Sequence, residues 1–155
     1  ADSLPRSDYY LNGQELPGQL CGKVAARFGI EGAITQPVFH AFCQNLNPLT
    51  GHSLTQRNVA NRTVGYDINF HCPKSVSILH ALSDDNHVLD AFQFSVDETM
   101  QAIEEDAQTR VRKRGQDEDR PTGELLYAHF LHQTARPVGG TVPDPHLHSH
   151  CFVFN

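Results

Sequence analysis

The sequence predicts an α+β domain, in which an antiparallel sheet has helices packed on one face. Residues 63–71 alternate apolar and polar side chains with the period of two typical of a strand, and residues 125–132 and 148–154 indicate two more strands. Residues 85–114 place apolar side chains three or four positions apart, which indicates a long amphipathic helix. Because consecutive strands usually pair, we expect 125–132 and 148–154 to form an antiparallel hairpin with a long loop.

Shorter signals place the remaining helices. Thr35 is expected to cap a short helix whose first turn contains Pro37. A second helix is expected to begin after Pro73. Gly115 is expected to end the long helix, and the basic residues at 110–114 would stabilise its carboxyl end. Acidic residues on both sides of this basic run argue against a role in binding DNA.

The strand over residues 63–71 has two chemically different faces. Every second residue shares a face, so Asp67 is the lone acid on a face that also contains Gly65, Asn69 and His71. The opposite face is apolar. Its members are Val64, Tyr66, Ile68 and Phe70.

Composition limits the class of protein. The chain has 155 residues, with no apolar run long enough to cross a bilayer, and we expect no signal peptide. Its four scattered cysteines form no C-x-x-C pair and are typical of reduced thiols in a cytosolic protein. The net charge of −6 argues against a protein that coats duplex DNA, although a bound divalent cation could supply positive potential locally. The ten histidines favour a search for metal ligands.

Three histidines have the spacing of a metal site. His148 and His150 are two residues apart, so on a strand both imidazoles lie on one face, roughly 6–7 Å apart. The expected hairpin brings His132 opposite this pair. Three imidazoles with open coordination positions are typical of a catalytic metal site. Metal-bound histidines usually donate their second ring N–H to a carboxylate, and Asp67 is a candidate for that carboxylate.

Other interpretations of these histidines stay open at this point. An isolated H-x-H pattern is also compatible with ordinary strand residues that bind nothing. His146 is an alternative ligand, although Pro145 is expected to keep it in the loop before the strand.

Two long segments of the chain resemble the motifs of one enzyme family. Residues 65–77 (GYDINFHCPKSVS) resemble a strand-then-helix motif, and residues 130–136 (FLHQTAR) with 144–150 (DPHLHSH) resemble a three-histidine motif. Both belong to the MobF-type conjugative relaxases, a branch of the HUH endonucleases. The resemblance extends over nearly the whole chain, and the two motifs together are highly specific.

The resemblance implies a role for each matching residue of the metal site. His132, His148 and His150 would hold one divalent metal ion, either Mg²⁺ or Mn²⁺, with Zn²⁺ as a further candidate. Asp67 would orient a histidine ligand. Lys74, which follows the proline that begins the second helix, could contact a DNA phosphate or simply lie in solvent.

The resemblance also implies a nucleophile and a reaction. Tyr9 and Tyr10 match the second tyrosine pair of the family, and either would attack a phosphodiester of single-stranded DNA. Arg136 would lie near the scissile phosphate, which suits its guanidinium fork. The expected activity is site- and strand-specific nicking at an origin of transfer during plasmid conjugation, with a 5′-phosphotyrosyl adduct as the intermediate.

The family pattern sets expectations for the whole chain. Residues 1–155 are expected to form a single relaxase catalytic domain that is truncated at both ends and acts in the bacterial cytoplasm. Accessory conjugation proteins are candidate partners beside the DNA. Leu20 stands where family members usually have a tryptophan.

Three alternative functions remain at this stage. A rolling-circle replication initiator would use the same metal and tyrosine chemistry. A three-histidine hydrolase that uses a bound water would need neither tyrosine. A non-catalytic remnant would bind DNA or a partner without reacting, and negligible metal affinity would favour it.

Overall fold

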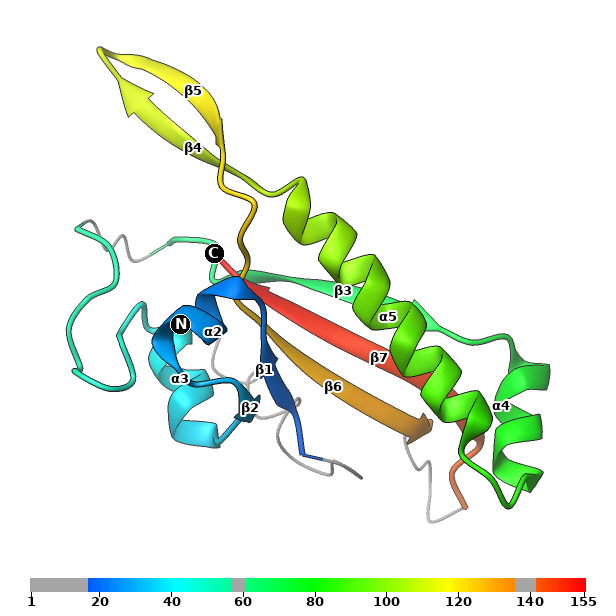
Figure 1. Ribbon diagram of the computed structural model, residues 1–155. Helices are drawn as coiled ribbons and strands as arrows, with labels where there is room; N and C mark the ends of the chain where they lie inside the picture. Colours follow the sequence, from blue (N-terminus) through cyan, green and yellow to red (C-terminus); the bar gives the residue numbers. More distant parts are fainter. Residues whose placement is uncertain (1–16, 57–60, 136–141) are drawn as a thin grey trace.

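The sheet is five-stranded and antiparallel, and it confirms the predicted α+β class (Figure 1). The structure is a computed structural model that describes residues 17–56, 61–135 and 142–155. None of the helices in these parts of the chain is long and apolar enough to span a membrane. The strands lie in the order β2 (Gly32–Ala33), β1 (Gln19–Cys21), β6 (Tyr127–Thr134), β7 (Pro145–Phe154) and β3 (Gly65–His71).

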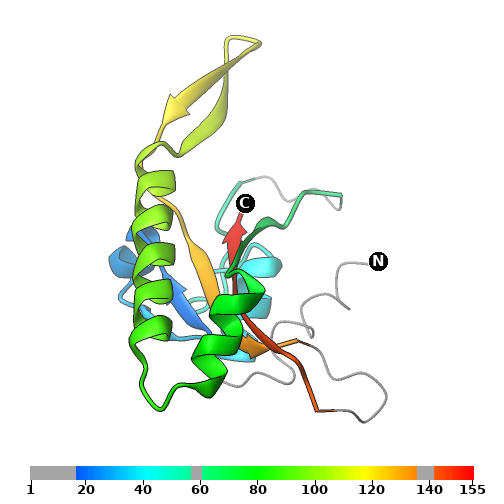
Figure 2. The ribbon, with the colours of Figure 1, turned by 90° about the vertical axis from the view of Figure 1, so that its right-hand side faces the viewer.

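One face of the sheet is covered by α5 (His87–Glu105) and α4 (Lys74–Leu82), as predicted (Figure 2). Val96 and Met100 of α5 are fully buried in a cluster with Tyr127 and Cys151 of the central strands. Ile68 packs against the same cluster, so the apolar face of β3 points to this layer, as its alternation predicts.

The opposite face carries two short helices that the sequence pattern does not predict as a layer. These are α2 (Lys23–Phe28) and α3 (Gln36–Cys43), the latter with Thr35 at its N-cap as expected. Phe39 of α3 is buried against Phe130 and Phe152. These two side chains lie on the face of the sheet opposite to that of Tyr127 and Cys151. The sheet is therefore covered by helices on both faces at one end. On the face that carries α2 and α3, the histidines of β6 and β7 lie past the Phe39 cluster.

The predicted pairing of β6 with β7 is confirmed, but β7 begins earlier than expected. Thr134 pairs with Pro145, and the N–H of Ala135 donates to the carbonyl of Asp144 at 2.8 Å. The ladder thus continues past His132 with one irregularity between His132 and Thr134. The expectation that Pro145 holds His146 in a loop is wrong, because a proline is tolerated as the first residue of a strand.

The prediction of a single helix over residues 85–114 is also wrong at its carboxyl half. The helix ends at Glu105, and the chain then forms a hairpin of β4 (Gln108–Lys113) and β5 (Gln116–Pro121). Arg114 and Gly115 both have positive φ, which is the type I′ turn that favours two-residue hairpins. The hairpin projects away from the sheet in Figure 1. Its basic run consequently lies on an exposed strand and does not stabilise a helix end.

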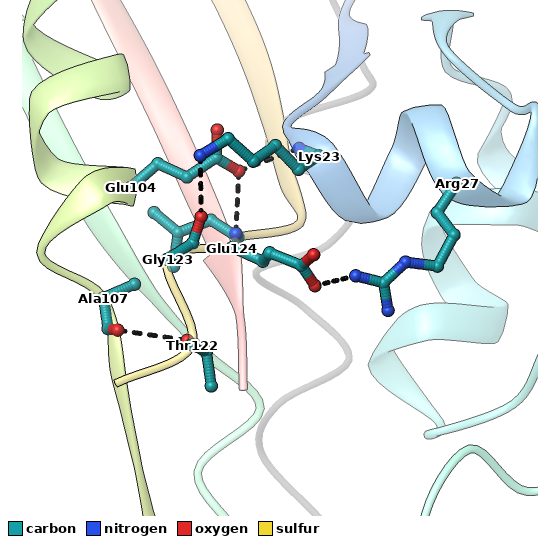
Figure 3. Close-up of polar contacts among 8 residues, drawn as sticks. Lys23, Arg27, Glu104, Ala107, Thr122, Gly123 and Glu124 are labelled. Atoms are coloured by element: carbon teal, nitrogen blue, oxygen red, sulfur yellow. Dashed lines mark hydrogen bonds and ion pairs between the residues drawn. The ribbon is translucent and has the colours of Figure 1, made fainter. Parts of the chain in front are cut away.

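Hydrogen bonds fix the base of this hairpin to the body of the domain (Figure 3). The carbonyl of Ala107 accepts bonds from the N–H groups of Thr122 and Gly123 and from the Thr122 hydroxyl, at 2.8–3.1 Å. The ammonium of Lys23 donates to the carbonyl of Gly123 at 2.9 Å. These contacts join the hairpin to the start of α2, on the other side of the sheet.

Ser77, in the strand-then-helix motif, joins α4 to the histidine strand. Its hydroxyl accepts a hydrogen bond from the buried N–H of Leu147 at 3.0 Å, one residue before His148. The Leu147 carbonyl accepts a bond from the N–H of Cys72. The motif therefore holds the beginning of β7 in place.

Replacing Ser77 with alanine is expected to lower the free energy of unfolding by about 1–3 kcal/mol, because the buried N–H of Leu147 would lose its acceptor. Urea unfolding of the parent and the variant measures the difference. Ser75 is exposed in the same motif, so its alanine variant is a matched control and should change stability by less than about 0.5 kcal/mol. Equal stability of the two variants would contradict the assigned role.

Candidate metal centre

His132, His148 and His150 meet on one face of the two central strands. His132 of β6 lies directly opposite His148 of β7 in the strand register. The ring centroids are 5.0 Å apart for His132 and His148, 5.3 Å for His148 and His150, and 5.7 Å for His132 and His150. His148 and His150 are each only 9% exposed. The expected juxtaposition of the three rings is therefore present.

The second ring nitrogens of the β7 histidines are held by acceptors. Nδ1 of His150 donates to Oδ2 of Asp67 at 3.0 Å, across the pairing of β3 with β7. Nδ1 of His148 donates to the carbonyl of His146 at 2.8 Å. Because a carboxylate and a carbonyl only accept, both Nδ1 atoms carry the proton, and in the neutral ring Nε2 is then the nitrogen with the lone pair.

The charge state of His148 also suits a ligand. Its pKa is lowered to about 4, mainly by burial and also by the neighbouring His146, His132 and His150, against the opposing effect of its hydrogen bond to the His146 carbonyl. The ring is therefore neutral at pH 7. Metal coordination requires the neutral form of imidazole, so no proton has to be displaced from His148 at that pH.

The ring separations can be compared with those that a bound ion requires. Three imidazoles at about 2.1 Å from one ion place their centroids roughly 4.6–5.3 Å apart. In the described parts of the chain, no group of three or more histidine, cysteine, aspartate or glutamate side chains is already arranged to hold a metal ion. Only the separation of His132 from His150 exceeds this range, by less than about half an ångström.

Comparison with known proteins identifies the family. The sequence pattern of the TrwC relaxase family matches residues 1–155. This chain belongs to the TrwC relaxase family. The multifunctional conjugation protein TraI of Escherichia coli strain K12 is 32% identical over 151 residues, which cover 97% of this chain and 8% of TraI.

Solved structures of the relaxase TrwC share the fold. A metal-bound structure of TrwC in complex with oriT DNA aligns with a TM-score of 0.80 and 27% identity, covering 96% of this chain and 52% of TrwC. A copper-bound complex of TrwC with oriT DNA gives the same TM-score and covers 97% of this chain and 53% of TrwC. The chain thus spans about half of those TrwC chains and less than a tenth of TraI.

The other predicted site residues of this relaxase-family chain divide into two groups. Lys74 lies at the start of α4, where its ammonium donates to the carbonyl of Pro145 at 2.9 Å and is 3.5 Å from the carboxylate of Asp144. It therefore lies beside the beginning of the histidine strand. Tyr9, Tyr10 and Arg136 lie outside the described residues.

Sequence reasoning missed His71 at the edge of this site and named His146 only as an alternative ligand. His71 lies opposite His148 in the pairing of β3 with β7, and its ring stacks on that of His146 with a centroid separation of 5.4 Å. The signal was present for His71, because it alternates with Asp67 on the same strand face. His146 was discounted because Pro145 suggested a loop.

Replacing Asp67 with asparagine is expected to weaken Mn²⁺ binding about 10- to 100-fold, because the amide can still accept the bond from His150 but lacks the negative charge that raises the basicity of the ring. Isothermal titration calorimetry measures the affinity. The asparagine variant of the exposed Asp84 is the control and should titrate like the parent. Parent-like affinity of the Asp67 variant would refute the assigned contact.

Proposed function

We propose that this chain nicks single-stranded DNA at an origin of transfer and transfers the strand, using a three-histidine metal site and a tyrosine nucleophile. The observation that carries this proposal is the convergence of His132, His148 and His150 on one sheet face, with Asp67 holding the Nδ1 of His150 at 3.0 Å. Membership of the TrwC relaxase family and the likeness to TrwC bound to oriT DNA support it.

In the proposed reaction the chain's own residues divide the work. His132, His148 and His150 bind a divalent cation, Mg²⁺, Mn²⁺ or Zn²⁺, and Asp67 orients His150. When bound, the cation supplies Lewis-acid polarisation of the scissile phosphate. The three histidines lie on one face of β6 and β7, and the opposite face of these strands packs into the buried cluster with Val96 and Met100. A packed core behind the two strands favours fixed positions for the ligands.

The covalent step exchanges one phosphodiester for another. The hydroxyl oxygen of Tyr9 or Tyr10 bonds to phosphorus while the bond from phosphorus to the 3′-oxygen breaks. The tyrosine proton is lost and the leaving 3′-oxygen takes up a proton, which gives a 5′-phosphotyrosine and a free 3′-hydroxyl. Arg136 would bind the non-bridging oxygens. Because the phosphodiester energy is retained, the reverse step rejoins the strand.

The proposal extends to the setting of the reaction. Single-stranded DNA suits a chain with a net charge of −6 better than duplex DNA does, since fewer phosphates have to be neutralised at once. We place the reaction in the bacterial cytoplasm, with accessory conjugation proteins as candidate partners.

A covalent-adduct assay tests the proposed function. The parent is incubated with single-stranded DNA spanning the origin of transfer and Mn²⁺, and adducts are separated on a denaturing gel. We expect a protein–DNA adduct in the parent and none after Tyr9 and Tyr10 are both changed to phenylalanine. Single variants identify the nucleophile. Cleavage that persists in the double variant without any adduct would favour a hydrolase and overturn the proposal.

A further inference from the structure

Two histidines that the proposed metal site does not use continue the histidine face toward the start of α4. His71 and His146 stack with an interplanar angle of 8° and a centroid separation of 5.4 Å. The ring of His148 lies 4.3 Å from that of His146 and 5.8 Å from that of His71. The imidazoles therefore form an unbroken row along β7, from His150 past His148 to this pair.

The geometry of the pair favours one kind of contact. The two rings lie face to face, with their planes 8° from parallel and their centroids 5.4 Å apart. A nucleobase inserted between the rings would need roughly 6.8 Å, twice the stacking distance of about 3.4 Å, and the rings are closer than that. The ring edges remain available for hydrogen bonds, and an imidazole N–H is a donor that suits a phosphate oxygen.

Positive charge lies next to the pair. The ammonium of Lys74 donates to the carbonyl of Pro145, the residue before His146, and its side chain is 54% exposed. Asp144 is 3.5 Å from the ammonium and offsets part of its charge. From His150 to His146 the strand advances by four residues, roughly 13 Å, which is longer than one nucleotide step of about 3.4 Å in stacked DNA. The row is thus long enough to contact more than one phosphate.

We propose that His71 and His146 form a phosphate subsite for the single-stranded DNA, adjacent to the phosphate at the three-histidine site. This inference rests on the proposed function and adds to it a second contact that fixes the register of the strand. Each imidazole donates one N–H to the neighbouring phosphate, and Lys74 contributes its charge. The contact orients the DNA and takes no part in the exchange of bonds.

A pair of double variants tests the subsite. His71 and His146 are both changed to alanine, and a matched control has the exposed His52 and His87 changed to alanine. Binding of fluorescein-labelled single-stranded DNA spanning the origin of transfer is followed by anisotropy, and Mn²⁺ binding by calorimetry. We expect DNA affinity to fall about 100-fold in the first variant only, because two hydrogen bonds to a charged group are lost and each contributes about tenfold or more. Mn²⁺ affinity and stoichiometry should stay at the parent values in both variants.

Neutral DNA linkages locate the contact. A single methylphosphonate, which makes one phosphate linkage neutral, is placed at each position of the oligonucleotide in turn. A linkage whose phosphate contacts the protein is identified because its neutral form binds the parent more weakly. We expect two neighbouring sensitive linkages in the parent and the loss of one of them in the variant of His71 and His146. An unchanged pattern, parent-like DNA affinity or a lost equivalent of Mn²⁺ would each overturn the subsite. A parent that binds no DNA would instead refute the proposed function itself.

Discussion

Changing His148 and His150 together to alanine is expected to abolish Mn²⁺ binding and to leave the fold intact. Two of the three proposed ligands are lost, so the affinity should fall by more than the roughly 100-fold that removal of an outer partner can cause. The backbone ladder of β7 does not depend on these side chains, and the neighbouring Leu147 and Cys151 are fully buried on the other face. Calorimetric titration measures the affinity.

Two controls make this result specific. The alanine variant of the exposed His52 and His87 removes two imidazoles elsewhere and should bind one Mn²⁺ as the parent does. Circular dichroism during thermal unfolding should show cooperative transitions in all three proteins. If the variant of His148 and His150 titrates like the parent, these residues are not ligands. Loss of the cooperative transition would mean that the strand itself has failed, and single substitutions would then separate the two effects.

The central geometry of the site was predictable because strands impose a period of two. That period places Asp67 on one face of β3 and both histidines of the H-x-H on one face of β7, and pairing of consecutive strands brings His132 opposite. No pattern along the sequence specifies that β3 is the other neighbour of β7. The contact of Asp67 with His150 depends on that tertiary pairing; the expectation came from Asp67 being the lone acid on its strand face, and the family resemblance implied the same role.

The carboxyl half of the long helix was mispredicted because its apolar positions fit two structures. Ala107 and Val111 continue the stripe of α5, yet Val111 also occupies a strand position paired with Glu118. The better signal is the charge order around the turn, where Arg110 faces Asp119 and forms an ion pair at 3.3 Å. Opposite charges placed symmetrically about an Arg-Gly dipeptide are typical of a hairpin.

The first strands were not predictable from periodicity because they are too short to show it. β1 has three residues and β2 has two. Tertiary packing maintains them: Leu20 is 2% exposed in the cluster of Phe39, and Gly18 lies so close to Phe130 that an added Cβ would be 2.3 Å from the ring. A local pattern cannot encode contacts with a residue more than a hundred positions away.

Replacing Glu104 with alanine is expected to lower the free energy of unfolding by about 3 kcal/mol or more. Glu104 lies in the last turn of α5 and is 5% exposed, and its Oε1 accepts hydrogen bonds from the N–H groups of Lys23 and Leu125, both at 2.8 Å (Figure 3). Alanine would leave two N–H groups without an acceptor, each costing about 1–3 kcal/mol. Lys23 is the first residue of α2, and Leu125 lies just before β6. Without the Glu104 carboxylate, α2 and the start of β6 would lose their hydrogen bonds to the end of α5, beside the hairpin base.

Glutamine and a neighbouring glutamate provide the comparison. Glutamine at position 104 retains an acceptor oxygen without the charge and should destabilise less than alanine does. Glu105 is adjacent but exposed, so its alanine variant should stay within about 0.5 kcal/mol of the parent in urea unfolding. Similar stability of the two alanine variants would mean that water replaces the carboxylate at no cost. A selective loss in the Glu104 variant would instead show that one buried carboxylate joins the three segments at the hairpin base.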